Sequence, residues 1–157
     1  MARIIPHLWY AREAEEAARF YASVFPDSHV NRVTAIGNET SSGPPESVKV
    51  VEFTLLGQSF LAIGAGPLDP FNHAVSFVVE CDTQDEIDRY WDGLLSGGGR
   101  PERCGWLKDR YGLSWQIVPK RLGELMTDPD RDKAGRVGQA MMTMVKLDIT
   151  RLEAAVA

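Results

Sequence analysis

The chain has 157 residues, 44% of them hydrophobic, with a formal net charge of −5 and a pI near 5.2. This length suits one domain of ordinary size or two half-domains that share a core, and the hydrophobic share is that of a globular protein. The basic residues are scattered rather than gathered in a stripe, which argues against nucleic acid and against an anionic membrane surface as partners.

The sequence also argues against membrane insertion and secretion. No apolar run approaches the roughly 20 residues that a membrane-spanning helix needs. The N-terminal stretch MARIIPHLWY lacks the apolar core and the small-residue cleavage site of a signal peptide. We therefore expect a cytoplasmic protein in which Cys81 and Cys104 are free thiols. The chain contains neither a CxxC pair nor a Cys/His zinc spacing.

The first half of the chain predicts a strand, a helix and three more strands. Residues 12–25 are rich in Ala and Glu and place their apolar side chains on one face, which predicts an amphipathic helix. Gly57 marks the turn of a hairpin. The predicted strands are residues 3–10, 29–37, 47–56 and 58–64, with a polar loop at 38–46 and a linker at 65–72.

The second half repeats this order. A strand at 73–81 precedes a helix at 83–95, for which Thr83 or Asp82 is the expected N-cap. Residues 104–119 form a predicted hairpin that turns at Gly112. Helices follow at 120–128 and 131–154. In the second arm of the hairpin, alternation places Ser114, Gln116 and Val118 on one face and Leu113, Trp115 and Ile117 on the other.

The two halves match in sequence as well as in order. EEAARFY at 15–21 aligns with DEIDRYW at 85–91, an offset of 70, and GQSFLAI at 57–63 aligns with GLSWQIV at 112–118, an offset of 55. The repeat predicts two modules, each with a strand, a helix and a small antiparallel sheet. Neither module can bury its sheet alone, so we expect the two sheets to curl around one cup.

This plan resembles the vicinal-oxygen-chelate superfamily, and within it the PhnB-like family. The likeness rests on five strings: PHLWY followed by EAEEAARFYASVFPDS (6–28), VEFTLLGQSF (51–60), AVSFVVECDTQDEIDRYWDGL (74–94), CGWLKDRYGLSWQIVP (104–119) and AMMTMVKLDITRLEAA (140–155). The resemblance implies an α+β fold of two βαβββ modules that form a glyoxalase-like cupped sheet, plus C-terminal helices. It implies one domain over 1–157, with module one at 1–66, module two at 72–119 and a helical tail at 120–157. It also implies a homodimer.

Enzymes of this superfamily hold a divalent metal with four His, Glu or Gln side chains. The family pattern carries these positions onto Pro6, Leu61, Ser76 and Gln116 of this sequence. Only Gln116 is a credible ligand, because proline and leucine offer no donor atom and neutral serine is a poor one. His7 is one residue beyond the family position at Pro6, so we expect its side chain on the opposite face of the strand. His73 begins its predicted strand, and together with Gln116 it is a weak candidate for a metal ligand. We therefore predict no bound metal.

The resemblance also suggests which side chains face a ligand in the cup. Gln116 could bind a carbonyl or hydroxyl through its amide, although a buried glutamine satisfied by the backbone fits equally well. Glu80 shares a strand face with Ser76, and a solvated strand end is its simpler interpretation. The candidate ligand-binding residues are Gln116, Ser76, Glu80, Leu61, Tyr10 and Trp106. Cys81 and Cys104 are either a reactive pair or, more simply, two packed thiols.

Three functions stay open at this point. The first is metal-independent binding of a small, partly apolar or aromatic molecule. The second is a metal-dependent lyase, isomerase or dioxygenase, and the third is a non-catalytic dimeric structural or regulatory module. Some members of the family carry a 3-demethylubiquinone methyltransferase label. The only Gly-rich turn suited to a nucleotide-type methyl donor, IGAGP at 63–67, leads into a proline-broken linker.

Overall fold

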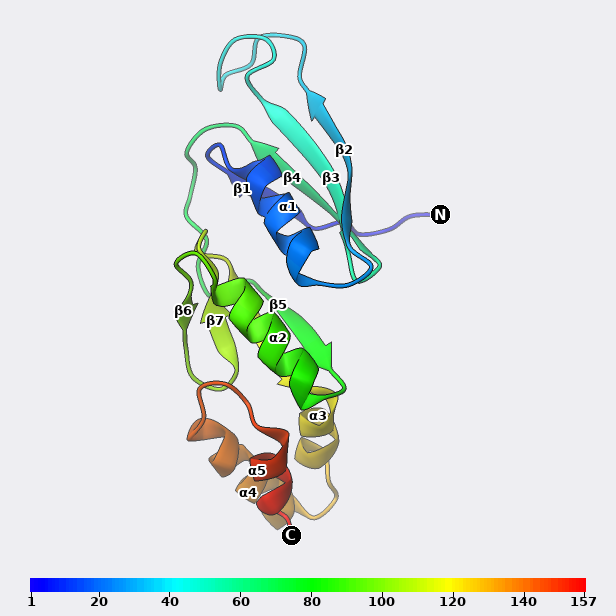
Figure 1. The fold of residues 1–157 in the computed structure, drawn as a ribbon, viewed down its shortest axis with the longest axis vertical. Helices are drawn as coiled ribbons and strands as arrows, with labels where there is room; N and C mark the ends of the chain where they lie inside the picture. Colours follow the sequence, from blue (N-terminus) through cyan, green and yellow to red (C-terminus); the bar gives the residue numbers. More distant parts are fainter. The chain divides into compact units, whose positions relative to one another are not determined.

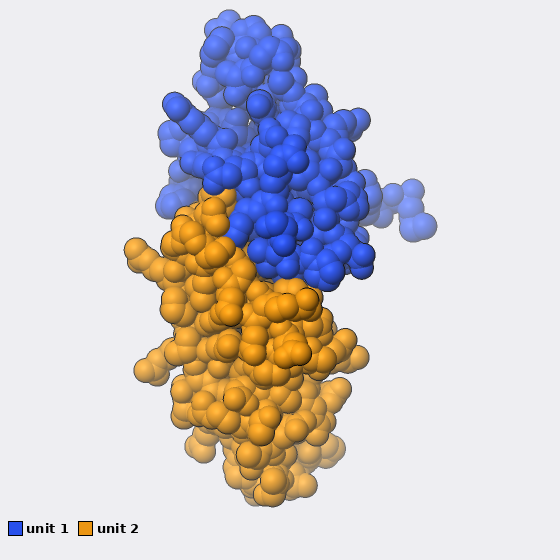
Figure 2. Space-filling view, viewed as in Figure 1, with its two compact units in different colours: residues 1–70 blue, residues 71–157 orange.

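The structure is a computed structural model that describes residues 1–157. It divides into two compact units, residues 1–70 and 71–157, which Figure 2 colours separately. The longest helices have 12 residues, and none combines the length and the hydropathy that a membrane crossing requires.

The first unit is a four-stranded mixed sheet with one helix (Figure 1). The chain runs through β1 (His7–Tyr10), α1 (Ala14–Val24), β2 (His29–Ala35), β3 (Lys49–Leu55) and β4 (Gln58–Gly64). The strand order is β1-β4-β3-β2, with β1 parallel to β4 and the other pairs antiparallel. The predicted turn at Gly57 is confirmed, and Gly57 has a φ of 82°.

The second unit repeats this arrangement and adds three helices. Its elements are β5 (Ser76–Cys81), α2 (Gln84–Leu95), β6 (Arg100–Pro101), β7 (Trp106–Lys108), β8 (Ser114–Pro119), α3 (Lys120–Met126), α4 (Arg131–Met142) and α5 (Ile149–Ala154). The strand order is β5-β8-β7-β6, with β5 parallel to β8. The α+β fold with two βαβββ modules is therefore confirmed.

Several predicted boundaries were wrong. The strand predicted at 73–81 begins only at Ser76, and the short strand β6 was missed because a two-residue strand leaves no periodic pattern. The helix predicted at 131–154 is two helices, α4 and α5. The second of these starts anew because the Asp148 side chain accepts a hydrogen bond from the Arg151 backbone N–H and acts as an N-cap.

In each unit the helix covers one face of the sheet. The buried face of α1 is mostly alanine, which lets the helix lie close to the sheet, and α2 buries larger side chains. The prediction of an N-cap before α2 is confirmed at Thr83, whose hydroxyl accepts from the Glu86 backbone N–H while Glu86 bonds back to Thr83. The sheet residues beneath the helices are Leu8, Tyr10, Val51, Phe53, Phe60, Ala62, Val79, Cys81, Leu107, Trp115 and Ile117.

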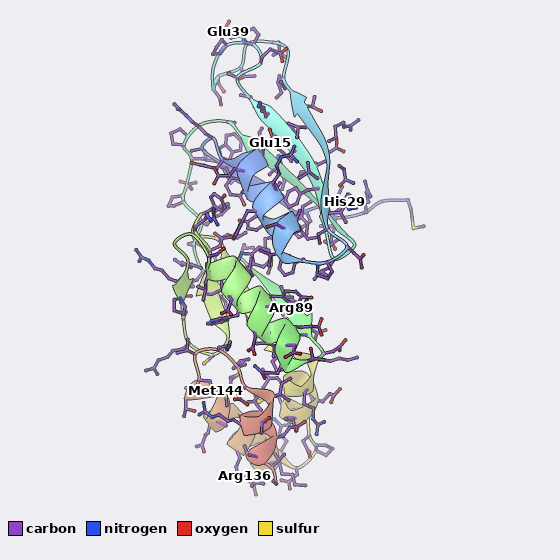
Figure 3. The ribbon with its side chains drawn as sticks, viewed as in Figure 1. Glu15, His29, Glu39, Arg89, Arg136 and Met144 are labelled. Carbon is purple, nitrogen blue, oxygen red and sulfur yellow. The ribbon has the colours of Figure 1, made fainter.

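The C-terminal helices form a small core of their own inside the second unit. This core contains Leu125, Val137, Met144, Leu147 and Leu152. Figure 3 labels Met144 and Arg136 in this part of the chain. The turn at Cys104 and Gly105 anchors it, because their backbone N–H groups donate to the carbonyls of Met144 and Val145 at 2.9 and 2.8 Å.

A substitution at Gly105 tests how much this turn contributes to stability. Its φ is +82°, and a Cβ at this position would lie 2.9 Å from the Ile117 carbonyl oxygen and 2.9 Å from Leu147 Cδ1. We expect Gly105→Ala to lower the free energy of unfolding by about 2–4 kcal/mol, through left-handed backbone strain and overpacking. Urea denaturation measures the change.

The matched control is Gly135→Ala in α4, where a Cβ meets nothing within 4 Å. This variant should be neutral or stabilising by up to about 1 kcal/mol, because alanine favours helix. Equal stability of the two variants would contradict the role assigned to the Gly105 turn.

The two cysteines lie in different surroundings. Cys81 is buried beneath α2, and desolvation, reinforced by the charges of Glu86 and Asp82, raises the pKa of its thiol to about 12. Cys104 is half-buried in the turn before β7. Both are free thiols, as the sequence predicts.

The pKa of Cys81 predicts a difference in reactivity. At pH 8 only on the order of one Cys81 side chain in ten thousand is a thiolate, so a disulfide reagent should modify Cys81 only after unfolding. We expect one thiol per chain to react in native buffer and a second to react in denaturant. Titration of wild-type protein and of Cys104→Ser separates the two, and rapid labelling of native Cys104→Ser would contradict the burial of Cys81.

Candidate functional site

In each unit we call the sheet face turned away from the helix the distal face. Four of the candidates, Ser76, Glu80, Trp106 and Gln116, lie on the distal face of the second sheet. Because paired residues on neighbouring strands share a face, the register of the second sheet fixes the membership of this face. The predicted alternation in β8 is confirmed, since Trp115 and Ile117 pair with Phe77 and Val79 toward α2, while Ser114 and Gln116 lie on the distal face.

Side chains on this distal face form two rows across the strands. The first row runs Arg100, Lys108, Ser114, Ser76. The second row runs Glu102, Trp106, Gln116, Val78, with Glu102 placed by its backbone N–H bond to the Trp106 carbonyl. Neighbouring rows are two residues apart along each strand, or about 7 Å. The first row is therefore cationic and polar, whereas in the second row the apolar side chains of Trp106 and Val78 lie on either side of Gln116.

Gln116 lies at the centre of the second row. Its Nε2 donates to the Ser76 hydroxyl at 3.0 Å, while its Oε1 accepts no hydrogen bond within the chain. Trp106 is half-buried on one side, and Val78 on the other side is 55% exposed. The amide thus presents a carbonyl oxygen between two apolar side chains.

His73 does not begin a strand but lies in the loop before β5. Its Nε2 is 3.0 Å from both carboxylate oxygens of Glu102, and its ring centroid is 6.1 Å from that of Trp106. A carboxylate in this position fixes the orientation of the imidazole ring. His73 therefore borders the distal face next to Trp106, with its side chain 55% exposed.

Sequence reasoning singled out Ser76 in the first row but missed the other three residues of that row. Ser114 was placed on the correct face but not singled out, although its hydroxyl is buried and has no hydrogen-bond partner. Such a group costs about 1–3 kcal/mol if nothing satisfies it. Asp109, which follows Lys108 in the chain, is buried and accepts from Trp115 Nε1 at 2.9 Å and from backbone amides.

In the first unit, the distal face carries a row of His7, Leu61, Glu52 and Arg32. Arg32 forms an ion pair with Glu52. Beside this row is a hollow of about 310 Å³ whose lining includes Leu61, Glu52, Ser59 and Thr54. Leu61 therefore lines a hollow of the first unit.

The expected orientation of His7 was wrong. His7 pairs with Leu61 and shares its face, and in the second sheet Val78 pairs with Gln116. The strand offset is therefore 71 rather than 70, because three residues separate β1 from α1 but only two separate β5 from α2. The corrected set of four positions is His7, Leu61, Val78 and Gln116.

The remaining candidates lie in different places. Tyr10 is 4% exposed on the helix-covered face, where its hydroxyl lies 2.9 Å from that of Tyr21, so it does not share the face of Leu61. Glu80 is exposed on the distal face, two rows from Ser76. The structure contains no group of three or more His, Cys, Asp or Glu side chains that could hold a metal ion.

Comparison with known proteins gives one family match. A family model described as 3-demethylubiquinone-9 3-methyltransferase matches residues 2–118. A search of curated proteins found no match.

Solved structures extend this result. The putative 3-demethylubiquinone-9 3-methyltransferase, PhnB protein, from Bacillus cereus is 29% identical, with a TM-score of 0.64 over 75% of this chain and 99% of that chain. Protein PA1353 from Pseudomonas aeruginosa is 18% identical, with a TM-score of 0.57 over 76% and 98% of the two chains. The fosfomycin resistance protein FosX from Listeria monocytogenes is 11% identical, with a TM-score of 0.55 over 79% and 97%, and shares the fold. This chain belongs to the PhnB-like family described as 3-demethylubiquinone-9 3-methyltransferase.

Proposed function

We propose that this protein binds a small, partly apolar or aromatic molecule on the distal face of the second sheet, without a metal. The observation that carries the proposal is the free carbonyl of Gln116 between Trp106 and Val78. An apolar surface with a few polar groups that fix orientation is the usual composition of a small-molecule site.

The surroundings of Gln116 support this choice. Its N–H group is held by Ser76, so the side-chain amide is oriented before any ligand arrives. An oriented acceptor loses little conformational freedom on binding. Trp106 offers an aromatic surface to a planar ligand, and His73 borders it. A hydroxyl or N–H group on an aromatic body is therefore the complementary ligand chemistry.

A screen of aromatic and amphipathic compounds by thermal shift tests this proposal. A ligand at 100 times its Kd should stabilise the protein by about 2.7 kcal/mol. Gln116→Leu should lower the affinity for that ligand about ten-fold, because one hydrogen bond to the ligand is lost. Leucine is tolerated at the equivalent strand position, Leu61, so the fold should persist.

The control for this experiment is Gln58→Leu, the same substitution at an exposed glutamine of β4. It should leave the affinity unchanged. A screen in which no compound shifts the transition would favour the alternative of a structural or regulatory module.

The homodimer implied by the family is a further proposal. Size-exclusion chromatography coupled to light scattering measures the mass of the protein in solution and tests it.

Metal-dependent chemistry is the second candidate, because the corrected register brings His7 onto the face of Leu61. His7 and Gln116 are the donors among the four family positions, whereas Leu61 and Val78 offer none. Two protein donors fall short of the three or four that catalytic metal sites use. The donor set therefore favours binding without a metal.

Metal analysis of protein purified without a histidine tag separates these candidates. We expect well below one divalent ion per chain, and no change in the melting temperature on adding zinc, nickel or manganese. A stoichiometric ion that disappears in His7→Ala, but persists in the control His29→Ala, would establish the metal-dependent alternative.

The methyltransferase activity in the family's description is not part of this proposal. Its methyl donor would need a Gly-rich turn from a strand into a helix. Here Gly64 ends β4, and the next helix begins only at Gln84. S-adenosylmethionine belongs in the compound screen, since a shift with it would revive this activity.

A further inference from the structure

We propose that the first row of the distal face, Arg100, Lys108, Ser114 and Ser76, binds an anionic group of the ligand, a carboxylate or a phosphate-type oxyanion. This inference rests on the proposed function and specifies the ligand of the same site. The ligand is then an aromatic or apolar body over Trp106 and Val78 that carries an anion at one end.

Charge on the distal face is separated along the strands. Arg100 and Lys108 pair across β6 and β7, and neither forms an ion pair or side-chain hydrogen bond within the chain. Glu102, in the next row, is engaged by His73. Glu80 is four residues beyond Ser76 along β5, or about 13 Å away. An anion is therefore attracted to the Lys108 end and repelled from the Glu80 end.

Ser114 supplies the second, independent observation. Its residue is 0% exposed, and its hydroxyl has no hydrogen-bond partner, although the strand pairing places it between Lys108 and Ser76. A buried hydroxyl without a partner is unfavourable unless a bound group accepts its proton. An oxyanion at this row would accept from Ser114 and from Lys108 together, which is a charge-assisted arrangement.

The spacing fits one ligand that spans both rows. Lys108 and Trp106 point to the same face of β7 with one residue between them, and Ser114 and Gln116 do the same on β8. An anion at the first row and an aromatic ring at the second are then about 7 Å apart. 4-Phenylbutyrate and 3-phenylpropylphosphonate, in which three methylene groups separate the ring from the anion, have about this reach, so they are suitable probes.

The experiment measures the affinity of four probes at low salt by calorimetry: 4-phenylbutyrate, 3-phenylpropylphosphonate, inorganic phosphate and neutral 4-phenylbutanol. We expect at least one aromatic anion to bind about ten-fold or more tightly than 4-phenylbutanol, and this advantage to shrink at high salt. Preference for 4-phenylbutyrate or for 3-phenylpropylphosphonate identifies the anion as carboxylate or phosphate-type.

Three variants locate the anion. Lys108→Met should abolish the advantage, and Ser114→Ala should reduce it without lowering the melting temperature, because a hydroxyl that has no partner is removed. Lys133→Met, an exposed lysine of α4 without an ion pair, is the control and should change nothing. Retention of the advantage in Lys108→Met, or an equal loss in Lys133→Met, would overturn the inference.

Failure of this inference is distinguishable from failure of the proposed function. If 4-phenylbutanol binds through Gln116 and the anions bind no better, the apolar site stands and the anion site is wrong. If inorganic phosphate binds through Lys108 while no aromatic compound binds, the anion site stands and the proposed function is wrong.

Discussion

Parallel pairing of the first and last strands organises each module. Parallel strands cannot be joined by a tight turn. Here α1 and α2 carry the chain over one face of the sheet, from the first strand of the module to its second strand at the opposite edge, and the antiparallel strands that follow return the last strand to the side of the first. The helix then buries its apolar stripe against that face of the sheet. The opposite face is left to the side chains that alternate with the core residues, so the pairing that builds the core also defines the distal face.

Much of this arrangement could be predicted because it is local. Alternation in β8 placed Gln116 and Ser114 on one face, and the Thr83 cap was readable from its neighbours. The α+β fold with repeated modules followed from two short sequence matches. In each case the signal lies within a few residues of the feature that it predicts, so tertiary packing had little chance to override it.

The errors arose where distant segments set the answer. The orientation of His7 depends on how β1 pairs with β4, and a one-residue difference in the strand-to-helix connection moved it to the other face. The fold also buries Asp109 and gives its carboxylate the Trp115 indole N–H, a contact that no local sequence pattern indicates. Arg100 could not be predicted as a site residue, because the two-residue strand β6 leaves no periodic pattern in the sequence. Only the pairing of β6 with β7 brings Arg100 beside Lys108.

The two modules share a backbone plan but differ in the chemistry of the distal face. Ser59 and Leu61 in the first module correspond to Ser114 and Gln116 in the second, so one position keeps its hydroxyl and the other changes from apolar to amide. In the first module the cation, Arg32, is already neutralised by Glu52. In the second module Arg100 and Lys108 have no acidic partner, and the neighbouring serine has no hydrogen-bond partner. The second module thus gathers two cations without an acidic partner and a hydroxyl without a hydrogen-bond partner in one row, and the proposed anion site rests on this difference.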